Sequence, residues 1–319
     1  MTCRSIRTRI PRRGAQAVGL IVGLGVLVWL IVRLVSDWDR VREDVAAANP
    51  ALVLASVACT LGAETLFGLI WSMELRGVSG RTVPVARSTG VFFVSGLARL
   101  LPGGVFTYLG RMSLARDLQV GRAHLVASMV METMTSAAAA LTLGTAVLLS
   151  DEAGSQVPGG RWWLLALPFA LAATYLPLSL RGLNLLLTRF GRSSVRIPRQ
   201  SGFGFFGGYV VAWLAFGLGL WFLIRAFGLD GPNMLVAAGA FSLSWLLGFV
   251  VVIVPGGLGV REGAMTALLA PWLGVEQSIL LALVSRFLWW LALGLLAAIG
   301  TWLLRRPNEL VDSSRAPSP

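Results

Sequence analysis

Long apolar runs limit what this chain can fold into more than any other feature of its sequence. A bilayer core about 30 Å thick needs about 20 apolar residues for each crossing helix. Inside lipid, backbone N–H and C=O groups must be satisfied within their own segment, so such runs are expected to be helices. Windows of this length with few charges occur at residues 17–35, 51–72, 123–149, 162–180, 204–226 and 277–303. The sequence therefore predicts an all-α, polytopic transmembrane helix bundle with six full spans.

Composition agrees with a membrane protein. Hydrophobic residues make up 56% of the chain and charged residues 13%, whereas soluble domains have about 45–50% and about 25%. The net charge of +12 resembles that of a nucleic-acid-binding protein. The arginines of this chain, however, lie in short loops beside the predicted spans, where the positive-inside rule places them. We therefore expect no nucleic-acid partner.

The loop charges also predict an orientation. Arginines cluster in residues 1–16, 76–87, 111–122, 181–199 and 305–306, whereas acidic or mixed loops occur at residues 37–44, 151–152, 230 and 276. Both termini are therefore expected in the cytoplasm, with the protein in a bacterial inner membrane. We expect a basic tail over 1–16, a transmembrane domain over 17–306 and a disordered polar tail over 307–319.

Two further apolar regions, 88–122 and 233–275, are interrupted by proline and glycine. Proline breaks a helix and glycine loosens its backbone, so each region is expected to form a re-entrant hairpin of two half-helices. The breaks contain Pro102, Gly103 and Gly104 in the first region, and Pro255, Gly256, Gly257 and Gly259 in the second. The half-repeats, about 51–149 and 204–303, predict an inverted-topology repeat. The alternative is an ordinary loop, because the same tripeptide occurs at Pro158-Gly159-Gly160.

Ionisable residues inside a membrane are costly and indicate function. We assign the binding of an anionic headgroup, most simply a phosphate, to Arg99, Arg111, Arg261 and Arg286. We assign charge balancing or proton linkage to Glu64, Glu132 and Glu262. Glu132 and Arg286 lie deep within their predicted spans, where they either line a polar cavity or form a structural salt bridge with each other.

The segment from Gly257 to Glu262 is expected to open a half-helix. Its free N–H groups and the positive end of the helix dipole favour an anion, to which Arg261 would add a two-pronged donor. Alternatively, Glu262 caps the helix by the same physics.

The sequence does not indicate an enzyme. It contains no zinc motif, no Walker-type phosphate loop and no G-x-S-x-G nucleophile elbow. His124 is the single histidine and is expected to anchor a span end at the membrane interface. We therefore expect no metal, no cofactor and no catalytic residue.

The string Val254-Pro255-Gly256-Gly257-Leu258-Gly259-Val260-Arg261-Glu262-Gly263 resembles the lysylphosphatidylglycerol synthase transmembrane-region family of flippase-like membrane proteins. Supporting matches are Leu101-Pro102-Gly103-Gly104, Gly110-Arg111, Glu132 and Arg286-Phe287, and the resemblance covers roughly residues 15–305. The family commonly has arginine after the middle-span glutamate, where this chain has Thr133.

The resemblance implies translocation of a membrane lipid or lipid-linked headgroup, most simply an anionic one. Well-known relatives fuse this module to a cytoplasmic aminoacyltransferase domain, which we do not expect in residues 307–319, so any lipid-modifying synthase would be a separate partner. Two other functions compete with this one: an accessory or scaffold subunit of a membrane lipid synthase or glycosyltransferase, and an ion-coupled transporter of small solutes.

Overall fold

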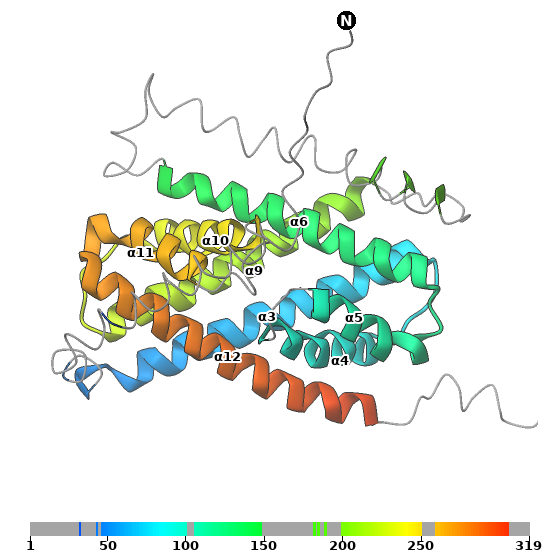
Figure 1. Cartoon of the computed structure of the whole chain (residues 1–319), viewed down its shortest axis with the longest axis horizontal. Helices are drawn as coiled ribbons and strands as arrows, with labels where there is room; N and C mark the ends of the chain where they lie inside the picture. The colour runs from blue at the N-terminus through cyan, green and yellow to red at the C-terminus, as the bar shows by residue number, and fades with distance from the viewer. Residues whose placement is uncertain are drawn as a thin grey trace, which may run out of the picture.

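The computed structural model describes residues 46–100, 105–148, 199–250 and 259–305, together with a few isolated positions outside these ranges. Within those ranges the chain forms eight α-helices and two short 3-10 helices, and no strand (Figure 1). The predicted all-α helix bundle is therefore confirmed.

The long helices that frame the bundle are α3 (Pro50–Ser79), α6 (Arg122–Leu148), α9 (Arg199–Ala226) and α12 (Val275–Arg305). These 4 helices are long and apolar enough to cross a membrane. At the helical rise, a 30-residue helix such as α3 is about 45 Å long, more than the hydrocarbon thickness. They match four of the six predicted spans; the windows 17–35 and 162–180 lie outside the described residues.

Helix α3 begins and ends at residues suited to those positions. The Asn49 side chain accepts a hydrogen bond from the Ala51 N–H at 3.0 Å, and Pro50 occupies the first turn, where its missing N–H costs nothing. At the other end Gly80 adopts a left-handed conformation with φ of 63° and returns its N–H to the Arg76 carbonyl. Glycine tolerates this conformation without strain, so the helix stops there.

Helices α3 and α9 pack against each other in opposite directions. The Asn49 N–H, just before α3, donates to the Ala226 carbonyl at the end of α9 with an N···O distance of 2.8 Å. The start of α3 therefore lies beside the end of α9, and this contact fixes the directions of the elements that follow each helix.

Two groups of shorter helices follow these spans, and we call them the first and second hairpin after the prediction. The first contains α4 (Val85–Gly96), the 3-10 helix η1 (Leu97–Leu100), α5 (Val105–Leu114) and the 3-10 helix η2 (Ala115–Leu118). The second contains α10 (Met234–Val250) and α11 (Val260–Leu273). Because the first follows the end of α3 and the second follows the end of α9, the hairpins start from opposite ends of the bundle (Figure 1).

The arms of the first hairpin are short. Helix α4 has 12 residues and α5 has 10, which correspond to about 18 Å and about 15 Å and fall short of a full crossing. Residues 101–104 and 251–258, which include Pro102, Gly103, Gly104, Pro255, Gly256 and Gly257, lie outside the described residues. The re-entrant turns and the inverted repeat therefore stay predictions.

Small residues let several helices approach closely. A Cβ atom placed on Gly217 of α9 would lie 2.2 Å from the Ala238 Cα of α10. A Cβ atom on Gly300 of α12 would lie 2.9 Å from the Gly90 carbonyl oxygen of α4. Close backbone contact of this kind is typical of helix packing in membranes. The second contact also places the end of α12 beside the start of α4.

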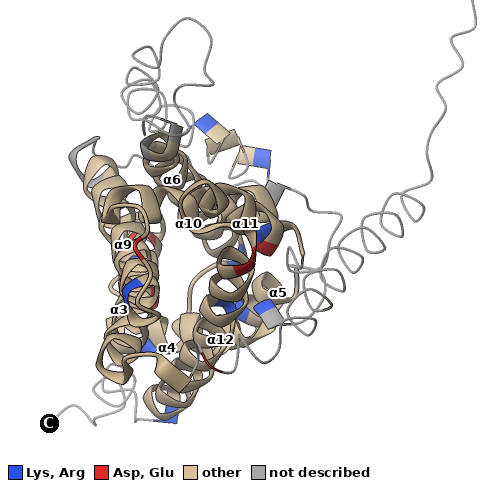
Figure 2. Cartoon of the chain, turned by 90° about the vertical axis from the view of Figure 1, so that its left-hand side faces the viewer, with Lys and Arg blue, Asp and Glu red and all other residues tan. Residues whose placement is uncertain are grey.

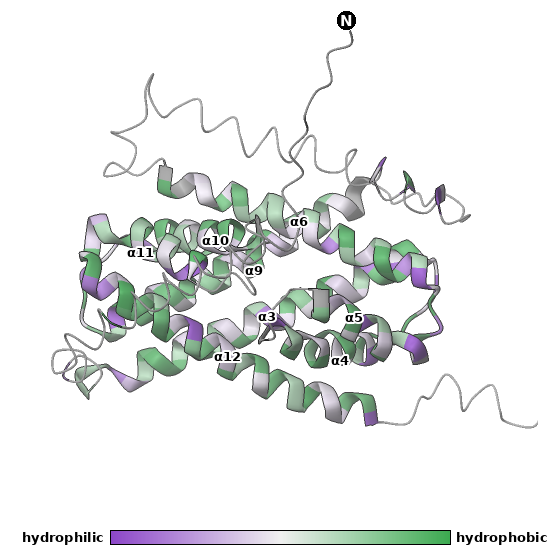
Figure 3. Ribbon diagram, in the orientation of Figure 1, coloured by the Kyte–Doolittle hydropathy of each residue, from purple (hydrophilic) through white to green (hydrophobic). Residues whose placement is uncertain are grey.

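Hydrophobic residues dominate the length of the helices, whereas hydrophilic residues gather at the helix ends and at a few interior positions (Figure 3). The core between α3, α9 and α10 is aromatic: Phe67 meets Tyr209 edge-on at a centroid distance of 4.9 Å, and Phe216 stacks on Phe241 at 5.0 Å. The interior hydrophilic positions are the exceptions in this core, and they form the candidate site.

Candidate functional site

Arg99 and Glu64, two residues predicted for the site, form an ion pair between the first hairpin and α3. The Arg99 Nη1 atom lies 2.8 Å from Glu64 Oε1 and 3.0 Å from Oε2. The Glu64 side chain is 4% exposed and that of Arg99 is 22% exposed. The indole N–H of Trp289, on α12, also donates to Glu64 Oε1 at 2.7 Å. Glu64 therefore connects α3, the first hairpin and the last span.

Arg286 and Glu262 form a second ion pair, between α12 and α11. The Arg286 Nη1 atom lies 3.1 Å from Glu262 Oε1, and both side chains are buried. The other carboxylate oxygen, Oε2, accepts the Gly259 N–H at 2.7 Å, where Gly259 has φ of 80° and begins α11. The alternative that Glu262 caps this helix is thus confirmed, and the helix N-terminus receives its negative charge from the chain itself.

Arg261 differs from the other arginines of the site. It is 5% exposed, and its guanidinium lies over the rings of Phe241 and Trp289 at 4.8 Å and 5.0 Å from their centroids. Helix α10 passes close by, since a Cβ atom on Gly248 would lie 3.1 Å from the Arg261 Cβ. Among the described residues no carboxylate oxygen lies within ion-pairing distance of Arg261.

Arg111 and Glu132 form a third ion pair, between α5 and α6, through Arg111 Nη1 and Glu132 Oε2. Arg111 is 1% exposed, and its guanidinium lies 4.6 Å from the Trp71 ring centroid and 4.5 Å from that of Phe92. Its Nε atom donates to Ser95 Oγ at 3.3 Å. The cation is thus held by one carboxylate, one hydroxyl and two aromatic faces.

The expected alternative of a salt bridge between Glu132 and Arg286 was wrong. Glu132 pairs with Arg111, and Arg286 pairs with Glu262. Each of these arginines finds its carboxylate on the neighbouring helix of its own half of the chain. Arg99 and Arg111, both assigned to headgroup binding, form ion pairs with glutamates on different helices, Glu64 on α3 and Glu132 on α6.

Glu74 is a member of the site that the sequence analysis missed. It lies on α3, is fully buried, and its Oε2 atom accepts a hydrogen bond from the Tyr209 hydroxyl of α9 at 3.2 Å. Glu132 and Arg111 lie within electrostatic range of it. Glu64, Phe67, Trp71 and Glu74 recur at spacings of three and four residues, the signature of one helix face, and this spacing was the available signal.

We call these eight residues the interior charge network. Its members are Arg99, Arg111, Arg261, Arg286, Glu64, Glu74, Glu132 and Glu262. Figure 2 shows basic and acidic ribbon positions along the helices within the bundle as well as at its ends. Arg261 lies within electrostatic range of Glu64, Glu262, Arg99 and Arg286, so these five residues form one continuous group. Among the described residues no three His, Cys, Asp or Glu side chains gather as metal ligands.

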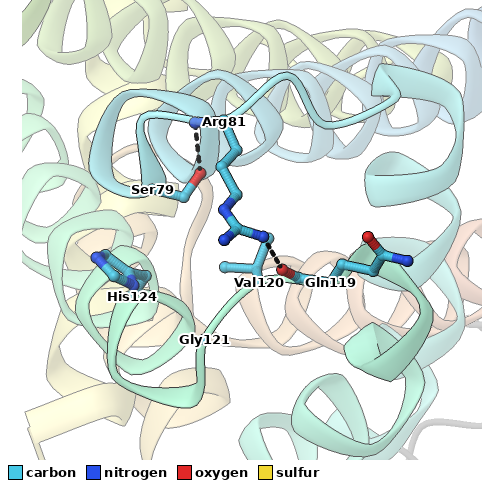
Figure 4. Close-up of a pocket in the computed structure, with 6 residues that line it drawn as sticks. All are labelled: Ser79, Arg81, Gln119, Val120, Gly121 and His124. Atoms are coloured by element: carbon cyan, nitrogen blue, oxygen red, sulfur yellow. Dashed lines mark hydrogen bonds between the residues drawn. The ribbon is translucent and has the colours of Figure 1, made fainter. Parts of the chain in front are cut away.

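A separate cavity of about 280 Å³ lies where α3 ends and α6 begins (Figure 4). It is lined by Ser79, Arg81, Gln119, Val120, Gly121 and His124. Arg81 closes one side by donating from Nη1 to the Gln119 carbonyl at 2.9 Å. None of the interior charge network lines this cavity. His124, predicted as an interfacial anchor, lies at this end of the bundle, and its anchoring role stays a prediction.

The family model described as the lysylphosphatidylglycerol synthase TM region matches residues 16–297, which include every described member of the interior charge network. The chain belongs to this family. Membership of the lysylphosphatidylglycerol synthase TM-region family, together with the apolar helices, identifies a multi-pass membrane protein and agrees with a function related to membrane lipids. No curated protein is similar enough to the chain to be matched.

Proposed function

We propose that this protein moves an anionic phospholipid or lipid-linked headgroup across the bacterial inner membrane, with Arg261 as the residue that binds the headgroup phosphate. Three of the four site arginines have carboxylate partners, whereas Arg261 has none among the described residues. A buried charge without a partner is costly. A bound phosphate would remove that cost, and this observation carries the proposal.

The geometry of Arg261 suits a phosphate ligand. Its guanidinium lies over the rings of Phe241 and Trp289. Ring contacts of this kind occupy the faces of the cation and leave its N–H edge for oxygen atoms. Arginine binds phosphate through two parallel hydrogen bonds, which are stronger than those between neutral groups. In this proposal Arg99, Arg111 and Arg286 supply the surrounding positive charge, balanced by Glu64, Glu132 and Glu262, and the protein performs no covalent chemistry.

Arg261→Gln is expected to slow lipid movement at least about tenfold, because losing a charge-assisted hydrogen bond costs about 1.5–3 kcal/mol and about 1.4 kcal/mol is a factor of ten. The assay reconstitutes purified protein in liposomes that contain acyl-labelled fluorescent phosphatidylglycerol and follows the label's accessibility to dithionite. Arg225→Gln is the matched control, since Arg225 pairs with the exposed Asp230 at a helix end. Unchanged movement in Arg261→Gln would overturn the proposal.

The second candidate is an accessory subunit of a membrane lipid synthase. The three ion pairs between helices favour this alternative, because paired charges hold helices together without needing a ligand. Under this alternative, wild-type protein moves no phosphatidylglycerol in liposomes and a synthase co-purifies with it. Transport that depends on Arg261 would exclude this alternative as the whole function.

The proposal includes an orientation with both termini in the cytoplasm. Arg81, Arg122 and Arg305 lie at one end of the bundle, where the start of α4 meets the end of α12, and Asp230 lies at the other end. Alkaline phosphatase, which is active only outside the cytoplasm, is therefore expected to be inactive when fused after Arg305 and active when fused at Asp230. The reverse result would invert the orientation.

A further inference from the structure

Glu74 is the second member of the interior charge network without an opposite charge beside it. It is fully buried, and the described residues place no arginine within ion-pairing distance of its carboxylate. The Tyr209 hydroxyl donates to Oε2, whereas Oε1 has no hydrogen-bond partner. A buried carboxylate oxygen without a partner is costly, and a proton removes the charge that causes the cost.

The groups packed around Glu74 do not supply the missing charge. Tyr209 of α9 donates a hydrogen bond to it, and the Thr135 hydroxyl of α6 also interacts with the carboxylate. Glu132 of α6 and Arg111 of α5 lie within electrostatic range. Arg111 already forms an ion pair with Glu132, so the carboxylate of Glu132 offsets the positive charge that Glu74 would otherwise experience. The contacts of α4 and α12 with α3 lie at other residues. Ser88 of α4 forms a hydrogen bond with Ser72 at 2.5 Å, and Trp289 of α12 donates to Glu64.

The charges of the whole network connect Glu74 to Arg261. The network holds four arginines and four glutamates, so its formal charge is zero when Glu74 is ionised. Protonation of Glu74 leaves a charge of +1, and an anionic headgroup at Arg261 returns it to zero. Proton binding and anion binding therefore favour each other, and linkage makes this reciprocal.

We propose that Glu74 is a proton-binding site that couples movement of the anionic headgroup to a pH difference across the membrane. This inference rests on the proposed function. Glu64, Glu132 and Glu262 each form an ion pair with an arginine and serve as its counter-ion. Glu74 instead takes up one proton as a headgroup binds and releases it as the headgroup leaves, so the occupied and empty states carry the same net charge. No other reactant is needed.

The test uses the full-length protein in liposomes with fluorescent phosphatidylglycerol, at equal pH on both sides and with an imposed pH difference. Wild-type protein is expected to move the lipid several times faster with the pH difference in one of its two directions. Glu74→Gln is expected to show the same rate under both conditions, because glutamine has the shape of the protonated acid but cannot release a proton. Glu276→Gln, a change at an exposed residue, should respond as wild type does.

A second measurement reports on the proton without transport. Infrared difference spectra between acidic and alkaline buffer should show the carbonyl band of a buried carboxylic acid in wild-type protein and lack it in Glu74→Gln. Tyr209→Phe should shift this band, since Tyr209 donates to the carboxyl group.

The outcomes separate the two proposals. Lipid movement that depends on Arg261 but is indifferent to the pH difference in wild type would overturn the coupling and leave the proposed function intact. A pH response that survives in Glu74→Gln, or an infrared band that the variant retains, would also overturn the role of Glu74. Absence of any lipid movement in wild type would remove the proposed function and the coupling with it.

Discussion

Glu132→Ala is expected to lower the free energy of unfolding by about 3–5 kcal/mol, the cost of removing one partner from a buried ion pair. Arg111 is 1% exposed and would be left as a buried cation over the rings of Trp71 and Phe92, with Ser95 as its remaining hydrogen-bond partner. Unfolding of the detergent-purified protein, followed by circular dichroism, measures the loss.

A double variant distinguishes the cost of the unpaired Arg111 charge from the cost of truncating the Glu132 side chain. Arg111→Met keeps a long side chain against the two rings, so the double variant Arg111→Met with Glu132→Leu is expected to regain most of the stability lost by Glu132→Ala. Buried ion pairs replaced together by apolar side chains are commonly neutral or stabilising. Asp230→Asn is a surface control that is expected to have no measurable effect, because the Asp230 side chain is fully exposed. A double variant as unstable as Glu132→Ala would show that the helix contact itself, and not the unpaired charge, carries the loss.

The spans could be predicted because lipid imposes a strong and local requirement on the sequence. The window 51–72 located α3, but the helix continues to Ser79. It does so because two charged residues after the window find partners within the bundle: Glu74 meets Tyr209, and the Arg76 Nε donates to the Val83 carbonyl at 2.6 Å. A hydropathy window ends a span at such charges. Glu74 therefore fell outside the predicted span and was not recognised as a buried residue.

The partners of the charged residues could not be predicted, because they depend on how the helices pack. Glu64 and Arg99 are 35 positions apart, and Arg111 and Glu132 are 21 apart. No periodicity relates such residues. The sequence therefore identified seven members of the network, but the ion pair that it offered for Glu132, as one of two alternatives, was with the wrong arginine. It also could not single out Arg261, which differs from Arg286 in having no carboxylate within ion-pairing distance among the described residues.

Two substitutions at Glu262, to alanine and to glutamine, are expected to lower the free energy of unfolding by different amounts. Glu262→Ala removes the carboxylate that faces Arg286 at 3.1 Å and the oxygen that accepts the Gly259 N–H at 2.7 Å. The first loss costs about 3–5 kcal/mol and the second about 1 kcal/mol. Glu262→Gln keeps an oxygen for the cap and loses the charge. Alanine should therefore destabilise the protein by about 1 kcal/mol more than glutamine does.

Chemical unfolding of both variants in the same detergent measures this difference, and hydrogen exchange at the start of α11 locates it. Faster exchange at the first turn of α11 in Glu262→Ala than in Glu262→Gln would attribute the additional loss to the cap. Equal losses in the two variants would show that the cap adds no stability and that Glu262 acts through Arg286 alone. If glutamine were neutral, the Arg286 charge would have to be compensated without Glu262, and Arg286 would then join Arg261 as a cation available to a phosphate.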